Sequence, residues 1–589
     1  MAFAGRSLFP TPPVARLVQS PLAAFRAEVE ALLRAAVPEG TSLPALEVPP
    51  DPAMGDLGMP CFTLAKALRK APPAIAADLA GRIAPSGWVA RVAAAGPYVN
   101  FAIDGARLAS AVLSDPRAAL DPVPAQRPNV LLEHTSANPN GPLHVGRARN
   151  PIVGDTLARL YRAAGHKVEV QYYMDNLGRQ VATLSWGKWN LDPATLPPAG
   201  RDKVDHDLVR YYQAAHDLAK QDPAVAAKVK HLVEELEAAK PELLARVRSV
   251  YGACFEGMLQ SLHRLGARYD SIKDESDVVL DGSVADTIAR LKQLPIAGVD
   301  DNGANYLDLS TLLKGQKDKF FFTRGDGTSV YATRDVAYHA WKAKHVAGGV
   351  LLNVLGEDHR LQALQVGTAL DALGIPRPTV VFYAFVSLPE GKMSTRANRV
   401  VFLDDLLDEA AARAYEEVKL RRGAELGEPQ LRRIAEAVGV AAVRFNIARI
   451  QPEKPIEFRW EEALSFDGDA APYLMYAYAR AASLLRKAKE AGLAPAGAAP
   501  PEAGEQKLLA TVARFQEAVQ EAARQNAPQR FAAYASSLAA AFNEYYRDHR
   551  VLECEDRAQQ ALRLAAVAAA HAALARTLDA LGIPALEDM

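Results

Sequence analysis

The order of patterns in residues 129–173 constrains the fold more than any other feature of the chain. NVLLEH (129–134) is a short apolar run that ends in polar residues, as buried strands do. A turn rich in proline and glycine follows, then the helical pattern ARNPIVGDTLARLYRAAG and a second strand pattern, KVEVQYY. Because a helix between two strands is the usual crossover of parallel strands, this segment predicts the start of a parallel α/β sheet.

The length of the chain requires more than one hydrophobic core. Its 589 residues exceed the ~50–250 residues of a typical domain, so about three or four units are expected. Prolines at positions 122, 124 and 128 interrupt regular structure and place a boundary near residue 125. We predict a small α+β domain over 1–125, a parallel-sheet domain over 126–404 with a charged helical insertion at about 185–280, and an all-α bundle over 405–589.

Local patterns support these three ranges. In the first range, AAFRAEVEALLRAAV and FTLAKALRK are predicted helices, and 98–103 is a predicted strand. In the second, strands are expected at YLDLS, SVYAT, GVLLNVLG and TVVFYAFVSL, which are rich in β-branched and aromatic residues. In the third, Leu508, Val512, Phe515 and Val519 recur at three- and four-residue spacing, which predicts a helix with one buried stripe.

Charge and cysteine content limit the possible partners. The 68 basic and 69 acidic residues nearly cancel, so any surface for nucleic acid must be local. Cys61, Cys254 and Cys554 lie far apart without a C-x-x-C pair, which argues against a disulfide framework or a zinc site and fits a reducing cytoplasm. Arginine and prolines interrupt MAFAGRSLFPTPP, and the Ala-rich tract 564–575 is shorter than the ~20 residues of a membrane span. We expect neither an export signal nor a membrane span.

Two loops carry side chains suited to phosphate. In the first, which joins the strand at 129–134 to the helix after it, Gly146 permits close approach while His144 and Arg147 can donate hydrogen bonds to phosphoryl oxygens. In the second, PEGKMSTR, Lys392 and Ser394 can hold a polyphosphate by charge and hydrogen bonding. Either loop alone is explained as simply by a solvated turn.

Together the two loops resemble the paired HIGH and KMSKS signatures of class I aminoacyl-tRNA synthetases, written here HVGR and KMSTR. EHTSANPNGPLHVG, YYMDNLGRQ, YATRDVAY and LGIPALEDM are similar to arginyl-tRNA synthetases, as are GDLGMPCFTLAKALRKAP, AAGPYVNF and SFDGDAAPYLMYAYARAASLLRK. The resemblance covers most of the chain outside the insertion. It implies a Rossmann-type catalytic domain in a cytoplasmic monomer that attaches L-arginine to tRNA(Arg) through arginyl-adenylate, with Mg²⁺ accompanying ATP and no structural metal.

The resemblance also assigns residues to the adenylation reaction. The catalytic pair is His144 and Lys392, and the expected ATP-binding residues are His144, Gly146, Arg147, Lys392 and Ser394. Arg147 stands where the usual signature has a second histidine, so its contact is open, and KMSTR lacks the second lysine of KMSKS. The resemblance further implies that tRNA binds before the adenylate forms.

Arginine recognition requires carboxylate and other acceptors, because a guanidinium carries five donors and no acceptor. Tyr331 and Asp335 are four residues apart in YATRD, which on a helix places them on one face. The resemblance implies six arginine-binding residues: Glu133, Ser136, Asn138, Tyr331, Asp335 and Glu357. The alternative for Asp335 is a surface ion pair with Arg334 or a nearby lysine.

Five residues are expected to contact tRNA. Tyr98 can stack on an unpaired base while Asn100 forms hydrogen bonds with the edge of that base. The resemblance implies a base in the tRNA D-loop, and these two side chains suit an adenine. Tyr476, Arg480 and the terminal Met589 match positions near the anticodon, with Arg486, Lys487 and Lys489 as further candidates for phosphate contacts. An amphipathic helix with solvated charges is the alternative for those three cations.

Two other functions are compatible with parts of the pattern. An inactive, RNA-binding relative would share the scaffold, but it has no reason to keep His144, Lys392 and Asp335 together. A class I synthetase for another amino acid, such as cysteine, would need metal-ligand cysteines around the pocket, and the three cysteines are not placed for this.

Overall fold

The computed structural model describes residues 20–49, 51–122, 126–310, 319–387, 401–465, 468–497 and 499–589. The chain divides into two units. The first comprises Met1–Gln126, Ala481–Glu517 and Ala540–Ala573; the second comprises Arg127–Arg480, Ala518–Ala539 and Leu574–Met589. Lys392 and Ser394 lie outside the described residues.

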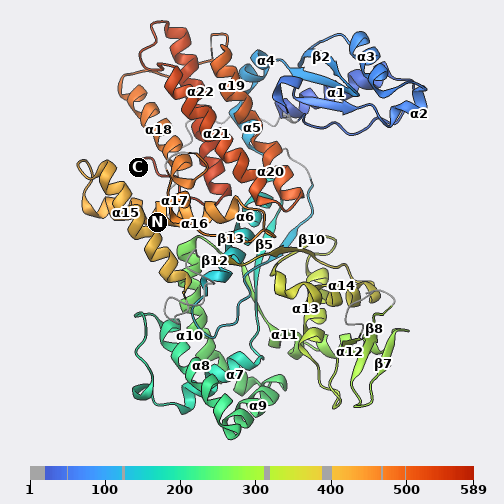
Figure 1. Ribbon diagram of the computed structural model, residues 1–589, viewed down its shortest axis with the longest axis vertical. Helices are drawn as coiled ribbons and strands as arrows, with labels where there is room; N and C mark the ends of the chain where they lie inside the picture. The colour runs from blue at the N-terminus through green and yellow to red at the C-terminus, as the bar shows by residue number, and fades with distance from the viewer. Residues whose placement is uncertain are drawn as a thin grey trace. The chain divides into compact units, whose positions relative to one another are not determined.

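The second unit is built on a five-stranded parallel sheet of the Rossmann type (Figure 1). Its strands are β4 (Val130–Glu133), β5 (Val168–Met174), β6 (Ser271–Asp274), β10 (Val350–Gly356) and β11 (Thr379–Tyr383). They lie in the order β11-β10-β4-β5-β6, so the direction of winding reverses between β4 and β10. All four residues of β4 are buried, as expected for a central strand of a sheet with both faces covered.

Helices cover the sheet as the opening pattern predicts. Helix α6 (Arg149–Ala163) follows β4 and contacts β4, β5 and β10, which makes it the crossover of the first β–α–β unit. Helix α13 (Tyr331–His345) precedes β10 in the chain and α14 (Arg360–Ala372) follows it, and the two helices pack on one another. The sheet domain therefore has the doubly wound arrangement that the resemblance implied.

The charged insertion is a group of helices that pack on one another (Figure 1). Helices α7 (Arg179–Asn190), α8 (Val204–Gln221), α9 (Pro223–Glu237) and α10 (Pro241–Leu265) pack against one another. The expected range 185–280 also takes in β6 and α11 (Glu275–Leu280), and β6 pairs with β5 as the edge of the sheet. Partly exposed SIKD has no long apolar run, which is why an edge strand of this kind is difficult to find in the sequence.

The strand predicted at SVYAT is instead the beginning of a helix. A small antiparallel sheet precedes it, with strands β7 (Ala297–Val299), β8 (Asn305–Asp308) and β9 (Lys319–Phe321). Val330 is extended, but α13 begins at Tyr331, and the Thr333 hydroxyl donates to the Phe322 carbonyl at 2.5 Å. Strand propensity is overridden here because the following residues bury one helical face.

Helices α15 (Leu403–Arg422) and α16 (Glu428–Ala448) belong to the second unit and pack closely on each other. Strands β12 (Val386–Ser387) and β13 (Ile456–Glu457) form a short parallel pair, so strand structure continues past residue 404. In this unit one apolar cluster includes the insertion, α15 and α16. The expected boundary at 404/405 thus lies inside a continuous core.

The first unit contains an antiparallel sheet in the order β1-β3-β2. The elements are α1 (Pro21–Ala36), β1 (Leu57–Pro60), α2 (Leu64–Leu68), α3 (Pro72–Arg82), β2 (Val89–Ala95), β3 (Tyr98–Ile103), α4 (Gly105–Ser114) and α5 (Pro116–Leu120). Helix α19 (Ala503–Ala513) packs on α4 in the same unit. The predicted strand at 98–103 and both predicted N-terminal helices are present.

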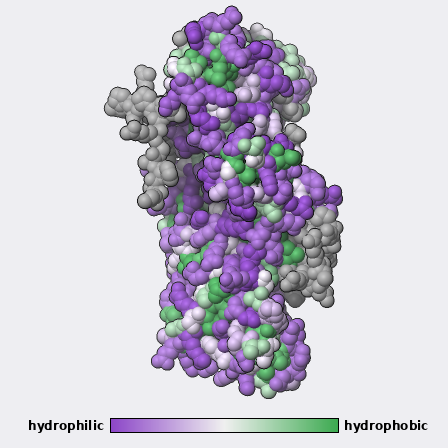
Figure 2. Space-filling view, turned by 90° about the vertical axis from the view of Figure 1, so that its left-hand side faces the viewer, coloured by the Kyte–Doolittle hydropathy of each residue, from purple (hydrophilic) through white to green (hydrophobic). Residues whose placement is uncertain are grey.

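The C-terminal part of the chain is helical, with α18 (Ala471–Glu490), α20 (Phe515–Arg524), α21 (Pro528–Asp548) and α22 (Arg557–Ala580). Each of these four helices contributes residues to both units. In the described residues, α22 alone is long and apolar enough to cross a membrane by length and composition, with a mean hydropathy of 1.3. Because 56% of its most apolar window is buried inside the protein, it has the character of a core helix. The face in Figure 2 is mostly hydrophilic, with apolar residues in small separate groups.

Candidate active site

A cavity of about 660 Å³ opens at the carboxyl ends of the parallel strands, where the winding reverses. Open α/β sheets bind ligands at this place because the loops after adjacent strands diverge there. The predicted residues that line the cavity are Glu133, Ser136, Asn138, Arg147, Tyr331 and Asp335. Segments 198 residues apart in the sequence therefore meet in one site.

Other predicted residues are placed differently. His144, Gly146 and Glu357 do not line this cavity. Glu357 accepts a hydrogen bond from Arg360 at 3.2 Å. Arg334, the alternative partner of Asp335, is buried and pairs with Glu275 at 2.8 Å instead.

The turn after β4 is held in an unusual backbone conformation. Thr135 and Ser136 have φ values of 68° and 42°, a left-handed conformation that costs about 1–3 kcal/mol for a residue other than glycine. The Asn150 side-chain oxygen accepts from the Thr135 N–H at 2.6 Å, and the Tyr269 hydroxyl donates to the Thr135 hydroxyl at 2.7 Å. These bonds turn Ser136 back toward Glu133, to which its hydroxyl donates at 2.9 Å.

A buried lysine neutralises Glu133. The Lys342 ammonium is fully enclosed; it binds the Glu133 carboxylate, donates to the Asn353 side chain at 3.0 Å, and lies 4.3 Å from the centre of the Tyr338 ring. Lys342 was not among the residues predicted from the sequence. Its position seven residues after Asp335 on α13 was an available signal, because that spacing returns to the same helix face.

Asp335 is ionised in the cavity wall. The His339 imidazole is 3.0 Å from one carboxylate oxygen, and the Gln362 amide donates to the other at 3.3 Å. Burial alone would raise the pKa of Asp335, but His339, the Lys342 ammonium and Gln362 together hold it below its ordinary value. Tyr331, one helical turn earlier, lines the same cavity and is 43% exposed.

Two further acceptors in the wall were missed. Asp175 follows β5, and one of its buried carboxylate oxygens has no hydrogen-bond partner among the described residues; the Tyr173 hydroxyl is buried in the same state. Burial, followed by the neighbouring Asp175 carboxylate, raises the pKa of Glu275 to about 8, against the opposing effect of Arg334. The unsatisfied acceptors at Asp175 and Tyr173 suit a ligand that brings several N–H donors.

The HVGR segment caps the short helix η2 (Val145–Arg147). His144 Nδ1 accepts the Gly146 N–H at 2.9 Å, which leaves Nε2 as the donor of the neutral ring. A β-carbon at position 146 would lie only 3.0 Å from that Nδ1, so glycine permits the close approach. Arg147 is exposed and lines the cavity.

Arg149 fastens the start of α6 to other segments of the second unit. Its guanidinium is fully buried and donates to the Ala384 carbonyl at 3.0 Å and to the Gln451 carbonyl at 2.6 Å. Both terminal nitrogens of the guanidinium donate to backbone carbonyls, which makes the start of the helix rigid. The HVGR segment is therefore presented on a fixed scaffold.

The predicted tRNA contacts differ in exposure. Tyr98 is half-buried, with its ring 5.9 Å from that of Phe62, whereas Asn100 is buried against Gly58. In α18, Tyr476 is 40% exposed and the Arg480 guanidinium lies 4.4 Å from its ring centre.

Met589, the last of the predicted tRNA contacts, is buried. Its carbonyl accepts a hydrogen bond from Arg422, in the last turn of α15. The contact fixes the end of the chain within the second unit.

Comparison with known families identifies the class. The family of "tRNA synthetases class I (R), catalytic domain" matches residues 109–460, more than half of the chain. "Arginyl tRNA synthetase N terminal domain" matches 23–103, and "DALR anticodon binding domain" matches 474–589. With the parallel sheet and the cavity at its switch point, these matches define a class I aminoacyl-tRNA synthetase.

Individual relatives are more specific. An arginine–tRNA ligase of Methanocella arvoryzae is 45% identical over 90% of this chain and 92% of its own length, and one of Methanothermobacter thermautotrophicus is 41% identical over 92% and 95%. The structure of Thermus thermophilus arginyl-tRNA synthetase is 31% identical, with a TM-score of 0.81 over 97% of this chain and 100% of that one. The chain belongs to the arginine–tRNA ligase family.

Acidification is expected to destabilise the site through His134, which is fully buried next to the left-handed turn. Burial lowers the pKa of His134 to about 4, although Asp155 opposes the shift. The pKa of His134 is lower in the folded than in the unfolded protein. Its contribution to the free energy of unfolding is therefore fully present above about pH 6.5 and is lost as the pH falls. Between pH 7 and 5 the loss is about 2 kcal/mol.

We expect His134→Asn to reduce the fall in melting temperature between these two pH values. Exposed His231→Asn is the matched control and leaves the fall unchanged. An equal acid sensitivity of wild type and His134→Asn would contradict the assignment.

Proposed function

We propose that the cavity binds L-arginine, that ATP binds next to it along the HVGR segment, and that these residues support the ligase reaction of this family. The observation that carries the proposal is the set of acceptors in the wall: the ionised Asp335, together with oxygens of Asp175 and Tyr173 for which the described residues supply no hydrogen-bond donor. A guanidinium offers several N–H donors and one positive charge, so it satisfies these groups together. No observation favours the inactive alternative.

In this proposal the two ends of arginine are bound by different elements. Tyr331 and Asp335 on α13 hold the guanidinium. The ammonium and carboxylate are held by Glu133, the last residue of β4, and by Ser136 and Asn138 in the turn after it. Lys342 binds Glu133 and fixes its position. Glu357 is retained as a contact only if its pair with Arg360 opens.

ATP is proposed to lie along the HVGR segment. His144 and Arg147 donate to phosphate oxygens, and Gly146 allows the adenine ring to approach. Lys392 and Ser394, outside the described residues, are proposed to bind the β- and γ-phosphates. Mg²⁺ enters as part of the substrate, bound by the phosphate oxygens.

The reaction needs positioning rather than a protein nucleophile. A carboxylate oxygen of arginine attacks the α-phosphorus of ATP in line, and the bond to the departing pyrophosphate breaks. A terminal ribose hydroxyl of tRNA then attacks the arginyl carbonyl and releases AMP. His144 acts by stabilising the charge that develops on phosphate oxygens in the first step.

Recognition of tRNA is proposed to use three regions. Residues 1–125, through Tyr98 and Asn100, contact the D-loop; 126–404 hold the acceptor end; and 405–589 contact the anticodon through Tyr476, Arg480 and Met589. Because Asn100 is buried and Met589 is bound by Arg422, these two are proposed to act after local rearrangement. We propose that the protein is a monomer, which sedimentation of the purified protein tests directly, and that it is located in the cytoplasm.

Asp335→Asn is expected to raise the KM for arginine by about 10- to 100-fold, since a hydrogen bond to a charged partner contributes about 1.5–3 kcal/mol. The KM for ATP should stay within about twofold, because no phosphate contact is removed. Arginine-dependent pyrophosphate exchange with cognate tRNA present measures both constants. Asp277→Asn, an exposed carboxylate outside the cavity wall, is the control. An unchanged arginine KM in Asp335→Asn would remove this residue from the site.

A further inference from the structure

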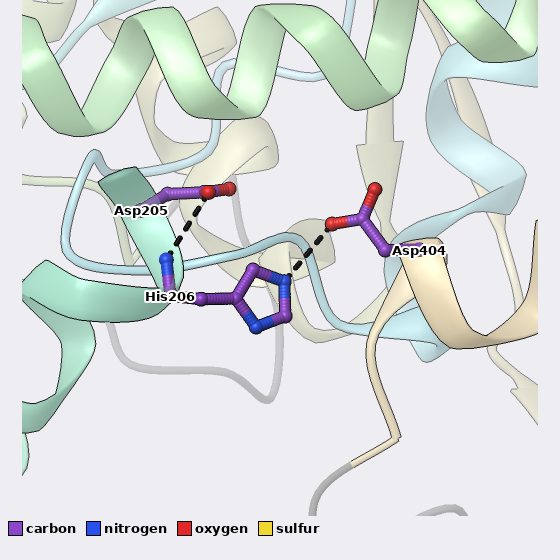
Figure 3. Close-up of side chains that lie close together, drawn as sticks. All are labelled: Asp205, His206 and Asp404. Atoms are coloured by element: carbon purple, nitrogen blue, oxygen red, sulfur yellow. Dashed lines mark hydrogen bonds and ion pairs between the residues drawn. The ribbon is translucent and has the colours of Figure 1, made fainter. Parts of the chain in front are cut away.

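A buried polar cluster lies outside the cavity wall. It comprises Lys203, Asp205, His206, Ser261 and Asp404, and we call it the Asp404 cluster. The His206 Nε2 is 3.0 Å from an Asp404 oxygen, and the Ser261 hydroxyl donates to the other at 2.9 Å. Figure 3 shows the imidazole pointing at Asp404, while Asp205 binds the His206 backbone N–H at 3.1 Å.

Three of these residues are spaced as metal ligands would be, but the Lys203 ammonium lies where a metal ion would bind. Ligand atoms of Asp205, His206 and Asp404 lie within 4.8 Å of one another. The Lys203 ammonium is 3.1 Å from Asp205 and 2.9 Å from Asp404, so it already supplies the positive charge between the carboxylates. The side chains of the cluster therefore satisfy one another without a metal ion. The function of the cluster follows from the elements that it links.

The cluster joins three helices that are distant in sequence. Lys203 directly precedes α8, Ser261 lies in α10, and Asp404 is in the first turn of α15. Close packing is needed at this point: a β-carbon on Gly257 of α10 would lie 2.6 Å from the Asp205 carboxyl carbon. The helical insertion is thus tied to the first turn of α15.

The residues just before Asp404 pair with the HVGR segment. We call residues 401–403 the strap. The Val145 N–H donates to the Val401 carbonyl at 3.1 Å, and the Leu403 N–H donates to the Leu143 carbonyl at 2.8 Å. Between these two bonds His144 faces Phe402 in an antiparallel bridge, and the Phe402 ring packs edge-on against His206 at 5.1 Å.

We propose that Asp404 is a positioning residue that holds His144 in place through the strap. The inference rests on the proposed phosphate contact of His144. Asp404 fixes one end of the strap, and the strap fixes the backbone on both sides of His144. Loss of the Asp404 charge releases the cluster and lets the His144 backbone shift, while the arginine-binding side chains on α13 keep their own supports.

Asp404→Asn is the direct test because it keeps the size of the side chain while it removes the charge and replaces one acceptor oxygen with an N–H donor. We expect the kcat of pyrophosphate exchange with cognate tRNA to fall by roughly 10- to 100-fold, since a small misplacement of a catalytic group has an effect of this size. The KM for arginine should remain within about twofold. Ser261→Ala, a milder change that removes one bond to Asp404, should shift kcat in the same direction by a smaller factor.

Asp408→Asn is the matched control. Asp408 lies one turn further along α15 and also pairs with the insertion, with Arg201 at 2.5 Å and Arg264 at 2.6 Å. It is half-exposed, and within the described residues no hydrogen bond or ion pair joins its side chain to the strap. We expect its kcat to stay within about twofold of the wild-type value. An equal loss in Asp404→Asn and Asp408→Asn would show general anchoring of α15 and would overturn the proposal.

A double-mutant cycle with His144→Ala decides whether Asp404 acts through His144. In the His144→Ala background, Asp404→Asn should lower kcat by no more than about twofold, because its effect has already been removed. Full, multiplicative losses would overturn this inference and leave the role of His144 intact. Normal exchange by His144→Ala alone would instead overturn the proposed phosphate contact, and the inference with it.

Discussion

Replacing His144 with alanine is expected to slow arginine-dependent pyrophosphate exchange by about 10²–10³-fold. A preorganised donor aimed at charge that develops in the transition state contributes about 2.7–4 kcal/mol. With Nδ1 already accepting the Gly146 N–H, the neutral imidazole can offer only Nε2–H to a phosphate oxygen. The KM for arginine should change by less than about twofold, because His144 does not line the arginine cavity.

A second substitution separates this role from helix capping. His144→Asn retains a side chain that can accept the Gly146 N–H, and asparagine is a favourable residue before a helix, but its amide is shorter than an imidazole. We expect the same loss of kcat as in His144→Ala with a smaller loss of thermal stability. Full activity in His144→Asn would mean that capping, rather than contact with phosphate, is what the histidine provides.

Lys342→Met is expected to destabilise the protein by about 3–5 kcal/mol, the cost of leaving one partner of a buried ion pair alone. Methionine nearly preserves the volume, so the effect reports the loss of the ammonium group and of its contacts with Glu133, Asn353 and the Tyr338 ring. Exposed Lys344→Met on the same helix should change stability by less than about 0.5 kcal/mol. Denaturant unfolding followed by a probe in the second unit measures both.

The pair can be tested by removing both charges. Glu133→Gln with Lys342→Met leaves no uncompensated charge, so a large part of the lost stability should return. Arginine binding should not return, because the Glu133 carboxylate is part of the proposed ammonium site. A double variant as unstable as Lys342→Met would mean that Lys342 stabilises the protein mainly through Asn353 and Tyr338.

The elements of the catalytic sheet could be predicted to different degrees. The strand at 130–133 and the helix after it follow from an apolar run and a 3.6-residue period, and both are present. SVYAT was wrongly predicted as a strand because its β-branched and aromatic residues favour a strand. Five residues are too few to show the 3.6-residue period of a helix. The edge strand β6 was hidden inside the insertion, since an edge with one exposed side needs no continuous apolar run.

In the candidate site, too, only the residues that belong to a local sequence pattern could be predicted. Tyr331 and Asp335 were found because helical spacing and a family motif coincide. Lys342 and Asp175 were missed because a lysine or aspartate in isolation is most often solvated, and only packing makes it a buried partner. Asn100 and Met589 are in the opposite situation: their motif predicts contact with RNA, and the fold buries them.

The amino-acid sequence alone determines the family, the parallel α/β core and the segments that contain the candidate site residues. Periodicity and motif spacing are local properties of the chain and can be recognised without a structure. Charge states and contacts follow from folding alone. Lys342 compensates Glu133 across 209 residues, and Asp404 meets His206 across 198. Electrostatic energies depend on distance in space and on the exclusion of water, and neither quantity exists until the chain has packed.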